Sequence, residues 1–221
     1  MAFETFVIVI AGASGVGKTR LTKRVAEILG DAVTLHFDDY KSVATYPTNL
    51  ARWVAAGKDL DAWQIPQLLN DLCALRSNES IVLPDGKGKI EPATFIVLEE
   101  PSGRERTGMR ALIDYVVLVD LPLEIALSRK LVQDLQHCLT DISSEQLAWA
   151  IGRVINYYSD YPLAREYYLT CIERVRTDAD LIVDGTRMID DLAHEIAEAA
   201  TTASGQDLSE ATLENSTTQR K

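Results

Sequence analysis

The sequence of 221 residues has little cysteine and no long apolar run. Its three cysteines, Cys73, Cys138 and Cys171, lie far apart and form no Cys-x-x-Cys pair, so neither a disulfide framework nor a zinc framework is expected. No apolar run approaches the roughly 20 residues that a membrane-spanning helix needs, which excludes an integral membrane protein. The N-terminus has no basic residue before its first apolar stretch, so we expect a cytoplasmic protein without a signal peptide.

Positive charge is scarce as well, because the chain has 22 lysines and arginines but 33 acidic residues, which gives a net charge of −11. A broad basic surface for nucleic acid is therefore not expected, and an anionic ligand would need a local site. The length fits one domain, which we expect to span residues 1–200 with a lid at about 125–175. The polar segment 201–221 lacks an apolar period and is predicted to be a disordered tail. The sequence is compatible with a homodimer but does not determine the oligomeric state.

Apolar runs alternate with helical patterns along the chain. The first run, residues 5–11, is nearly continuous and rich in β-branched residues, as in a strand that is buried on both faces of a parallel sheet. Further strands are predicted at 32–37, 94–98, 115–119 and 181–183, with an edge strand at 81–83. Helices are predicted at 18–29 and 122–137, from a capping box at 143–146 to about 175 with a break near Pro162, and at 189–200. This alternation predicts an α/β fold with a doubly wound parallel sheet flanked by helices, in which ligands bind at the carboxyl ends of the strands.

The residues that follow the first strand fit the full G-x-x-x-x-G-K-[ST] pattern of a phosphate-binding loop, or P-loop. Small residues let several backbone N–H groups converge on one anion, and the positive end of the next helix points to the same place. Lys18 supplies a charge for the β- and γ-phosphates, and the Thr19 hydroxyl can coordinate Mg²⁺. A glycine turn without a ligand is the alternative, but the flanking strand and helix favour a P-loop NTPase-type fold. The predicted nucleotide-binding residues are Gly12, Ala13, Ser14, Gly15, Val16, Gly17, Lys18 and Thr19.

Acidic residues end two of the predicted strands. Asp38 and Asp39 follow the strand after the P-loop helix, where one of them could accept the proton of a substrate hydroxyl. The alternative is that they cap the next element. Glu99 ends an apolar strand and is placed to hold Mg²⁺, although the choice between Glu99 and Glu100 stays open.

Two groups of basic residues are candidates for contacts with anionic groups. Arg129 and Lys130, on the helix after the strand at 115–119, could close over the phosphates as a lid, or they could face solvent. Arg104, Arg106 and Arg110 form a second cluster just after Glu99 and Glu100, which could bind an anionic group of the substrate or balance local acids. The histidines and tryptophans are interpreted as structural: His36, His137, His194, Trp53, Trp63 and Trp149.

The order of these motifs resembles the uridine kinase and phosphoribulokinase family of P-loop kinases over about residues 5–195. The Asp-x-Tyr after the second strand and the Arg-Lys-x-x-x-Asp of the lid are more specific signals than the glycine loop. The matching segments are GASGVGKT at 12–19, HFDDY at 36–40, DAW at 61–63, IVLEE at 96–100, DYVVLVDLPLEIALSRKLVQD at 114–134 and ADLIVDG at 179–185.

The resemblance implies that a phosphoryl group passes from ATP, with Mg²⁺, to a hydroxyl of a small molecule. It implies that Asp38 is the catalytic base and that Tyr40, from the same motif, lies at the substrate. It also implies that Asp61 touches the substrate and that Glu99 serves the metal.

The chain departs from the family at two places. Glu100 stands where the family has a glycine, so a second carboxylate enters the site. In the lid, Lys130 and Gln133 stand where the family has arginines, and lysine cannot form the forked contact that arginine forms.

The sequence therefore predicts an ATP-dependent kinase whose acceptor is nucleoside-, sugar- or vitamin-like. Its expected catalytic residues are Lys18, Asp38, Arg129 and Lys130, and Arg104 is a further candidate for a substrate contact. The altered lid favours an alternative, a P-loop ATPase or nucleotide-binding regulator that has no acceptor substrate.

Overall fold

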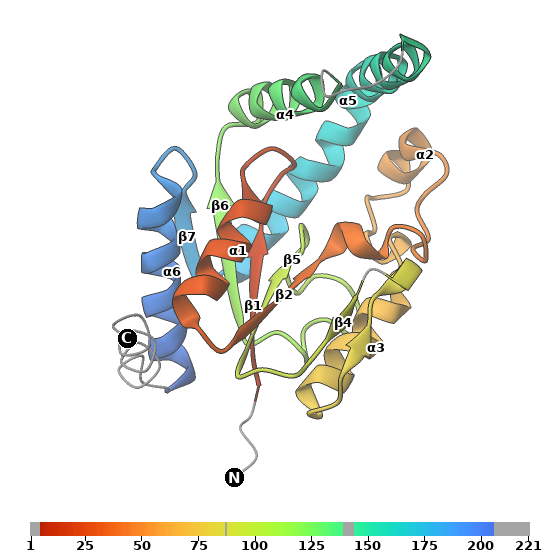
Figure 1. Ribbon diagram of the computed structural model, residues 1–221. Coiled ribbons are helices and arrows are strands. Elements are labelled where there is room, and N and C mark those ends of the chain that lie inside the picture. Colours follow the sequence, from red (N-terminus) through yellow and green to blue (C-terminus); the bar gives the residue numbers. More distant parts are fainter. Residues whose placement is uncertain (1–4, 87, 139–143, 206–221) are drawn as a thin grey trace.

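A parallel sheet of five strands forms the centre of the protein, in the order β2-β5-β1-β6-β7 (Figure 1). The computed structural model describes residues 5–86, 88–138 and 144–205. The chain places β2 and β5 on one side of β1 and β6 and β7 on the other, so the prediction of a doubly wound parallel sheet is confirmed. The strands are β1 (Phe6–Ala11), β2 (Ala32–His36), β5 (Phe95–Glu99), β6 (Tyr115–Asp120) and β7 (Leu181–Asp184).

The central strand β1 is apolar along its whole length because both of its faces are covered. Its side chains alternate between the two faces of the sheet, as the pleat of a strand requires. Ile8 and Ile10 belong to one hydrophobic core, whereas Val7 and Val9 belong to the other. The continuous apolar run in the sequence is thus the signature of two cores that share one strand.

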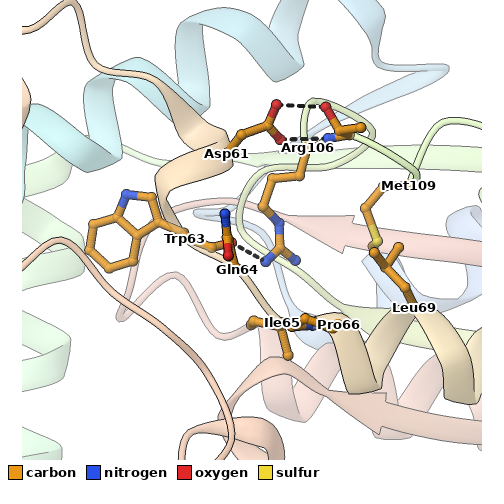
Figure 2. Close-up of a pocket in the computed structure, with 9 residues that line it drawn as sticks. Asp61, Trp63, Gln64, Ile65, Pro66, Leu69, Arg106 and Met109 are labelled. Carbon is orange, nitrogen blue, oxygen red and sulfur yellow. Dashed lines mark hydrogen bonds between the residues drawn. The ribbon is translucent and has the colours of Figure 1, made fainter.

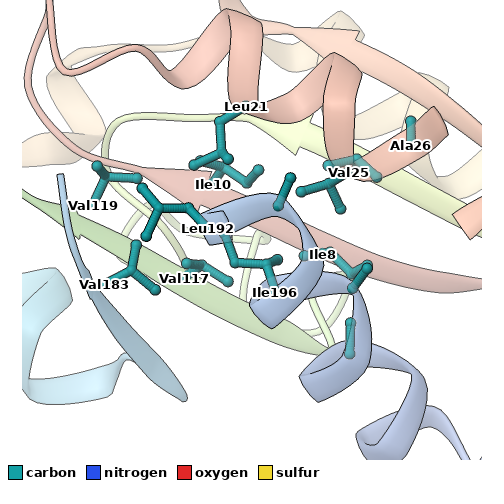
Figure 3. Close-up of a cluster of buried hydrophobic side chains, with 14 of the residues drawn as sticks. Ile8, Ile10, Leu21, Val25, Ala26, Val117, Val119, Val183, Leu192 and Ile196 are labelled. Atoms are coloured by element: carbon teal, nitrogen blue, oxygen red, sulfur yellow. The ribbon is translucent and has the colours of Figure 1, made fainter. Parts of the chain in front are cut away.

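Helices α1 (Lys18–Leu29) and α6 (Ile189–Ser204) cover one face of the sheet. Leu21 and Val25 of α1 pack with Ile196 of α6 over the apolar side chains of β1, β6 and β7 (Figure 3). The opposite face is covered by α3 (Pro66–Arg76) and by the last turns of α5 (Ser144–Asp178). A short helix, α2 (Leu50–Ala55), packs against α5.

Helix α4 (Leu123–Cys138) and the first half of α5 project beyond the carboxyl edge of the sheet as an arm (Figure 1). The predicted break near Pro162 does not occur, because α5 continues through this proline. A proline removes one backbone hydrogen bond, but the second half of α5 is fixed by its buried residues Tyr167, Cys171 and Val175. Within the described residues, no helix is both long enough and apolar enough to cross a membrane.

The pairing of one strand and the end of one helix also differ from the prediction. The strand expected at the sheet edge, β3 (Ile81–Val82), pairs instead with β4 (Lys89–Ile90) in a separate hairpin. Helix α6 continues to Ser204, four residues beyond its predicted end, because Thr201 is buried against the core and continues the apolar face. The rest of the predicted tail, residues 206–221, lies outside the described residues.

We expect Ile196→Ala to lower the free energy of unfolding by about 2–5 kcal/mol, since this side chain is fully buried between α6 and the sheet and its loss leaves a cavity. Urea unfolding followed by circular dichroism measures the change. Met188→Ala is the control, because Met188 is 72% exposed just before α6 and its loss should change stability by less than about 0.5 kcal/mol. Equal losses in the two variants would contradict the packing of α6.

Candidate functional site

The loop from Gly12 to Thr19 connects β1 to α1 and is closely fitted to its surroundings. Gly12 and Gly15 have φ angles of 143° and 88°, a region that residues with a side chain rarely adopt. A Cβ atom on Gly15 would lie 2.1 Å from the carbonyl oxygen of Ala126 in α4, and one on Gly12 would lie 3.0 Å from that of Val119 in β6. The loop therefore needs glycine both for its curvature and for its contact with the neighbouring elements.

The Lys18 side chain folds back over this loop. Its Nζ donates a hydrogen bond to the carbonyl oxygen of Ala13 at 3.0 Å and lies 3.8 Å from Oε1 of Glu99. Burial lowers the pKa of the Lys18 ammonium, while the negative charges of Glu99 and Asp38 oppose that shift. One ammonium is thus held inside the concave side of the loop, where a phosphate chain would lie.

Glu99 connects the loop to the carboxyl ends of β2 and β5. Its Oε2 accepts a hydrogen bond from the Thr19 hydroxyl at 2.8 Å and lies 3.0 Å from Nδ1 of His36. Burial raises the pKa of Glu99, but the hydrogen bond with His36, the charge of Lys18 and the Thr19 hydroxyl outweigh it and keep this pKa below its usual value. The structure therefore holds an ionised carboxylate beside the P-loop threonine.

His36 belongs to this cluster, although its isolation in the sequence predicts only a structural role. It ends β2 and is paired in register with Glu99 at the end of β5. Its place two residues before Asp38, at the carboxyl end of a parallel strand, was the signal that could have identified it.

Glu100 forms a buried ion pair with Arg106, and its charge also acts on Lys18. The same carboxylate accepts hydrogen bonds from the backbone N–H of Ser102 at 3.0 Å and from its hydroxyl at 2.6 Å. Arg106 also donates to the carbonyl oxygen of Trp63 at 3.0 Å, and its guanidinium lies 5.5 Å from the centre of the Phe37 ring. Of the two adjacent glutamates, the structure thus places Glu99, and not Glu100, beside Thr19.

Asp38 and Tyr40 lie on a 3₁₀ turn, η1 (Phe37–Tyr40), directly after β2. The Asp38 side chain is 66% exposed and forms an ion pair with Lys41 at 2.9 Å. Its charge also raises the pKa of Lys18, so the two side chains are within electrostatic reach of each other. Tyr40 does not lie where the prediction put it: it is fully buried, and its hydroxyl donates to Asp71 at 2.8 Å, so it anchors η1 to α3 and does not face a substrate.

A pocket of about 370 Å³ opens next to the Glu100–Arg106 pair (Figure 2). Asp61 lies at its rim, where its two carboxylate oxygens accept hydrogen bonds of 2.6 Å from the backbone N–H and the hydroxyl of Thr107. These bonds lower the pKa of Asp61 and fix its orientation. The pocket is lined by Asp61, Trp63, Gln64, Ile65, Pro66, Leu69, Arg106, Thr107 and Met109.

Trp63 has a double role, since its indole ring packs 4.3 Å from the ring of Tyr167 while the residue also lines the pocket. The ring points away from the other lining side chains in Figure 2. The structural role that the sequence predicted therefore describes the ring, and the backbone of Trp63 holds Arg106 in the pocket wall.

The two basic residues of the predicted lid lie on α4, above the P-loop. Arg129 donates to the carbonyl oxygen of Gly185 at 3.1 Å, and Lys130 forms an ion pair with Asp134 and lies 5.5 Å from the centre of the Tyr157 ring. The arm is thus positioned next to the loop, but both cationic groups are engaged with protein partners.

Arg104 lies at the opposite edge of the sheet from the P-loop, which corrects its predicted place at the substrate. Its guanidinium donates to the carbonyl oxygen of Asp114 at 2.6 Å and to the carboxylate of Asp180 at 2.8 Å. These two residues come just before β6 and β7, at the amino ends of the strands. Arg104 therefore joins two strands and balances local acids, which is the alternative that the sequence left open.

The chain is similar in sequence to curated kinases, although no protein-family model matches it. A uridine kinase of Chlamydia pneumoniae is 28% identical over 193 residues, which are 81% of this chain and 81% of that protein. A phosphoribulokinase of Synechocystis sp. is 28% identical over 142 residues, which are 58% of this chain and 42% of that protein.

The chain is similar to the uridine kinases over four fifths of its length. The resemblance that its motifs predicted is therefore confirmed. Among solved structures, one described as a possible uridine kinase from Bacillus stearothermophilus is 18% identical, with a TM-score of 0.48, and the match covers 83% of this chain and 91% of that chain.

We expect Gly15→Ala to weaken the binding of ADP by at least about tenfold, because the new Cβ would collide with the Ala126 carbonyl and force the loop or α4 to move. Isothermal titration calorimetry with Mg²⁺ present measures the affinity. The control is Gly57→Ala, which has a similar φ of 99° but an open space around the new Cβ. Unchanged ADP affinity in Gly15→Ala would contradict the close contact between the loop and α4.

For Arg104→Gln we expect the free energy of unfolding to fall by about 2–4 kcal/mol, since a mostly buried guanidinium loses its charge-assisted hydrogen bonds. Arg110→Gln is the matched control, because that side chain is 63% exposed and its ion pairs should contribute less than about 1 kcal/mol. If Arg104→Gln were as stable as the wild-type protein but bound ligand more weakly, Arg104 would be assigned to the binding site after all.

Proposed function

We propose that the protein is a kinase that transfers the γ-phosphoryl group of ATP to a hydroxyl of a small molecule. One observation carries the proposal: a P-loop with its lysine and a carboxylate on the P-loop threonine lie together at the carboxyl edge of a parallel sheet, and a half-open pocket adjoins the Arg106 partner of the next residue, Glu100. The curated relatives named as kinases support it. A cytoplasmic location and a homodimer stay predictions.

The residues at this edge fit a nucleotide with a magnesium ion. The loop has the curvature and the buried ammonium that a triphosphate requires. Thr19 and Glu99 offer the hard oxygen ligands that Mg²⁺ prefers, and the described residues contain no group of three or more acidic, histidine or cysteine side chains that could hold a metal by themselves. When it is bound, Mg²⁺ neutralises charge that develops on the β- and γ-phosphates.

The chain itself supplies position, charge and a proton acceptor. Lys18 holds the phosphates, and Asp38 on η1 orients the acceptor hydroxyl and takes its proton. Asp61, fixed by Thr107 at the rim of the pocket, accepts a hydrogen bond from a second hydroxyl of the acceptor. Arg129 can reach the moving phosphoryl group after it leaves the carbonyl of Gly185.

An ATPase or nucleotide-binding regulator without an acceptor is the second candidate. The observation that favours it is the engagement of Arg129 and Lys130 with protein partners, which leaves the lid cations away from the phosphates in this conformation. A screen of ADP release over nucleosides, sugars and vitamin alcohols separates the two candidates. Release that depends on an added hydroxyl compound supports the kinase, and release without one supports the alternative.

We expect Asp38→Asn to lower the rate of phosphoryl transfer by about 10²- to 10⁴-fold, since the amide cannot accept the hydroxyl proton. The affinity for ADP should stay within about threefold of the wild-type value, because Asp38 is not part of the loop. Coupled assay of ADP release and calorimetry measure the two quantities.

Asp39→Asn is the matched control, as it removes the same charge from the neighbouring position of the same turn. A rate of transfer that falls as much in Asp39→Asn as in Asp38→Asn would assign the effect to the charge of the turn and reject Asp38 as the base.

A further inference from the structure

The pocket next to the Glu100–Arg106 pair is lined by few charged side chains, which limits what it can bind. Among the described residues that line it, Arg106 is the one that carries a positive charge. Its guanidinium is paired with Glu100 and also donates to the carbonyl oxygen of Trp63. Asp61, the acidic residue of the lining, is held by Thr107. Glu100 thus already neutralises the charge of Arg106, although the buried Nε of Arg106 has no hydrogen-bond partner among the described residues.

The pair of Arg106 and Glu100 is deeply buried, with side-chain exposures of 7% and 0%. Removing both charges from water is costly, and in such surroundings neither partner is given up unless another charge replaces it. An anionic ligand would have to displace Glu100 from Arg106, and Glu100 is fixed independently by the backbone and the hydroxyl of Ser102. The pair therefore behaves as a neutral part of the wall.

The remaining lining residues offer apolar surface and neutral polar groups. Leu69, Ile65 and Met109 form an apolar side, and Gln64 contributes an amide close to Arg106 (Figure 2). This surface suits a compact ligand that has one apolar face and hydroxyl groups near Asp61.

We propose that Glu100 determines the charge preference of the acceptor site: by neutralising Arg106, it restricts the kinase to uncharged hydroxyl compounds and excludes hydroxy acids and sugar phosphates. The inference rests on the proposed function for the identity of this pocket as the acceptor site. It assigns Glu100 as a specificity-determining residue that acts through Arg106, whereas Glu99 is the glutamate that contacts Thr19.

The first experiment uses the wild-type protein and matched ligands. Ribose is compared with ribose 5-phosphate, and glucose with gluconate, by thermal shift in the presence of saturating ADP and Mg²⁺, which keep anions out of the P-loop. We expect no stabilisation by the two anions, and an ADP-release screen should find acceptors among uncharged compounds. Stabilisation by an anion, or faster transfer to an anionic acceptor than to its uncharged counterpart, overturns the proposal.

The second experiment frees the arginine. Glu100→Gln keeps the size and the hydrogen-bond acceptor of the side chain but removes its charge, so Arg106 can pair with a ligand. We expect gluconate and ribose 5-phosphate to bind this variant at least about tenfold more tightly than the wild-type protein, as one new charge-assisted hydrogen bond would give. Glu105→Gln is the control, since it removes a carboxylate of the same loop that pairs with Arg110 outside the pocket lining.

The unpaired arginine could destabilise the single variant. A double variant, Glu100→Gln with Arg106→Gln, avoids this problem because it leaves no unpaired charge in the protein interior. It removes both charges, and anion binding should return to the wild-type level. Anion binding that is equal in Glu100→Gln and the wild-type protein, or that persists in the double variant, refutes the role of Glu100. Failure of the proposed function is distinct from these results, because it would appear as ADP release that no hydroxyl compound stimulates.

Discussion

The carboxylate of Glu99 is the interaction on which the arrangement of the site depends. It connects the end of β5 to the end of β2 through His36 and to the start of α1 through Thr19, and it faces the ammonium of Lys18. Because parallel strands bring their carboxyl ends to one edge, three segments that are distant in the sequence meet at this one side chain. The same carboxylate stabilises the buried lysine, whose charge would otherwise be costly in the interior.

Two adjacent glutamates have different surroundings because a strand ends between them. Glu99 is the last residue of β5 and faces the P-loop, whereas Glu100 follows it and turns into the protein toward Arg106. One carboxylate thus serves the phosphate side of the site and the other serves the wall of the pocket. This division explains how a chain with a net charge of −11 can contain both a pocket whose arginine is neutralised and a site for a polyanion.

The sequence was sufficient for those parts of the structure that local patterns determine. The P-loop follows from the spacing of Gly12, Gly17 and Lys18, and the sheet follows from apolar runs that alternate with helical periods. Side-chain direction at the ends of elements was not predictable in the same way. The Tyr40 side chain points into the core toward Asp71, and that of Arg104 binds Asp180. Neither side chain therefore lies at the site that the sequence predicted for it.

Contacts between distant segments explain the remaining differences. Arg106 and Glu100 are close in the sequence. The position of Arg106 in the pocket wall, however, depends on its contacts with Trp63 and Phe37, which come from other parts of the chain. Contacts of this kind between distant segments cannot be predicted from the periodicity of the sequence. The prediction of a break at Pro162 failed for a related reason, since tertiary burial of α5 beyond the proline offsets one lost hydrogen bond.

The arm formed by α4 and α5 is coupled to the nucleotide loop by a close steric contact. The backbone of α4 at Ala126 leaves no space for a side chain at Gly15. Such a closely packed contact limits how near the arm and the loop can come to each other. Any rearrangement of the arm that brings Arg129 toward a phosphate must therefore be accommodated by the loop as well, which makes the position of α4 sensitive to what the loop binds.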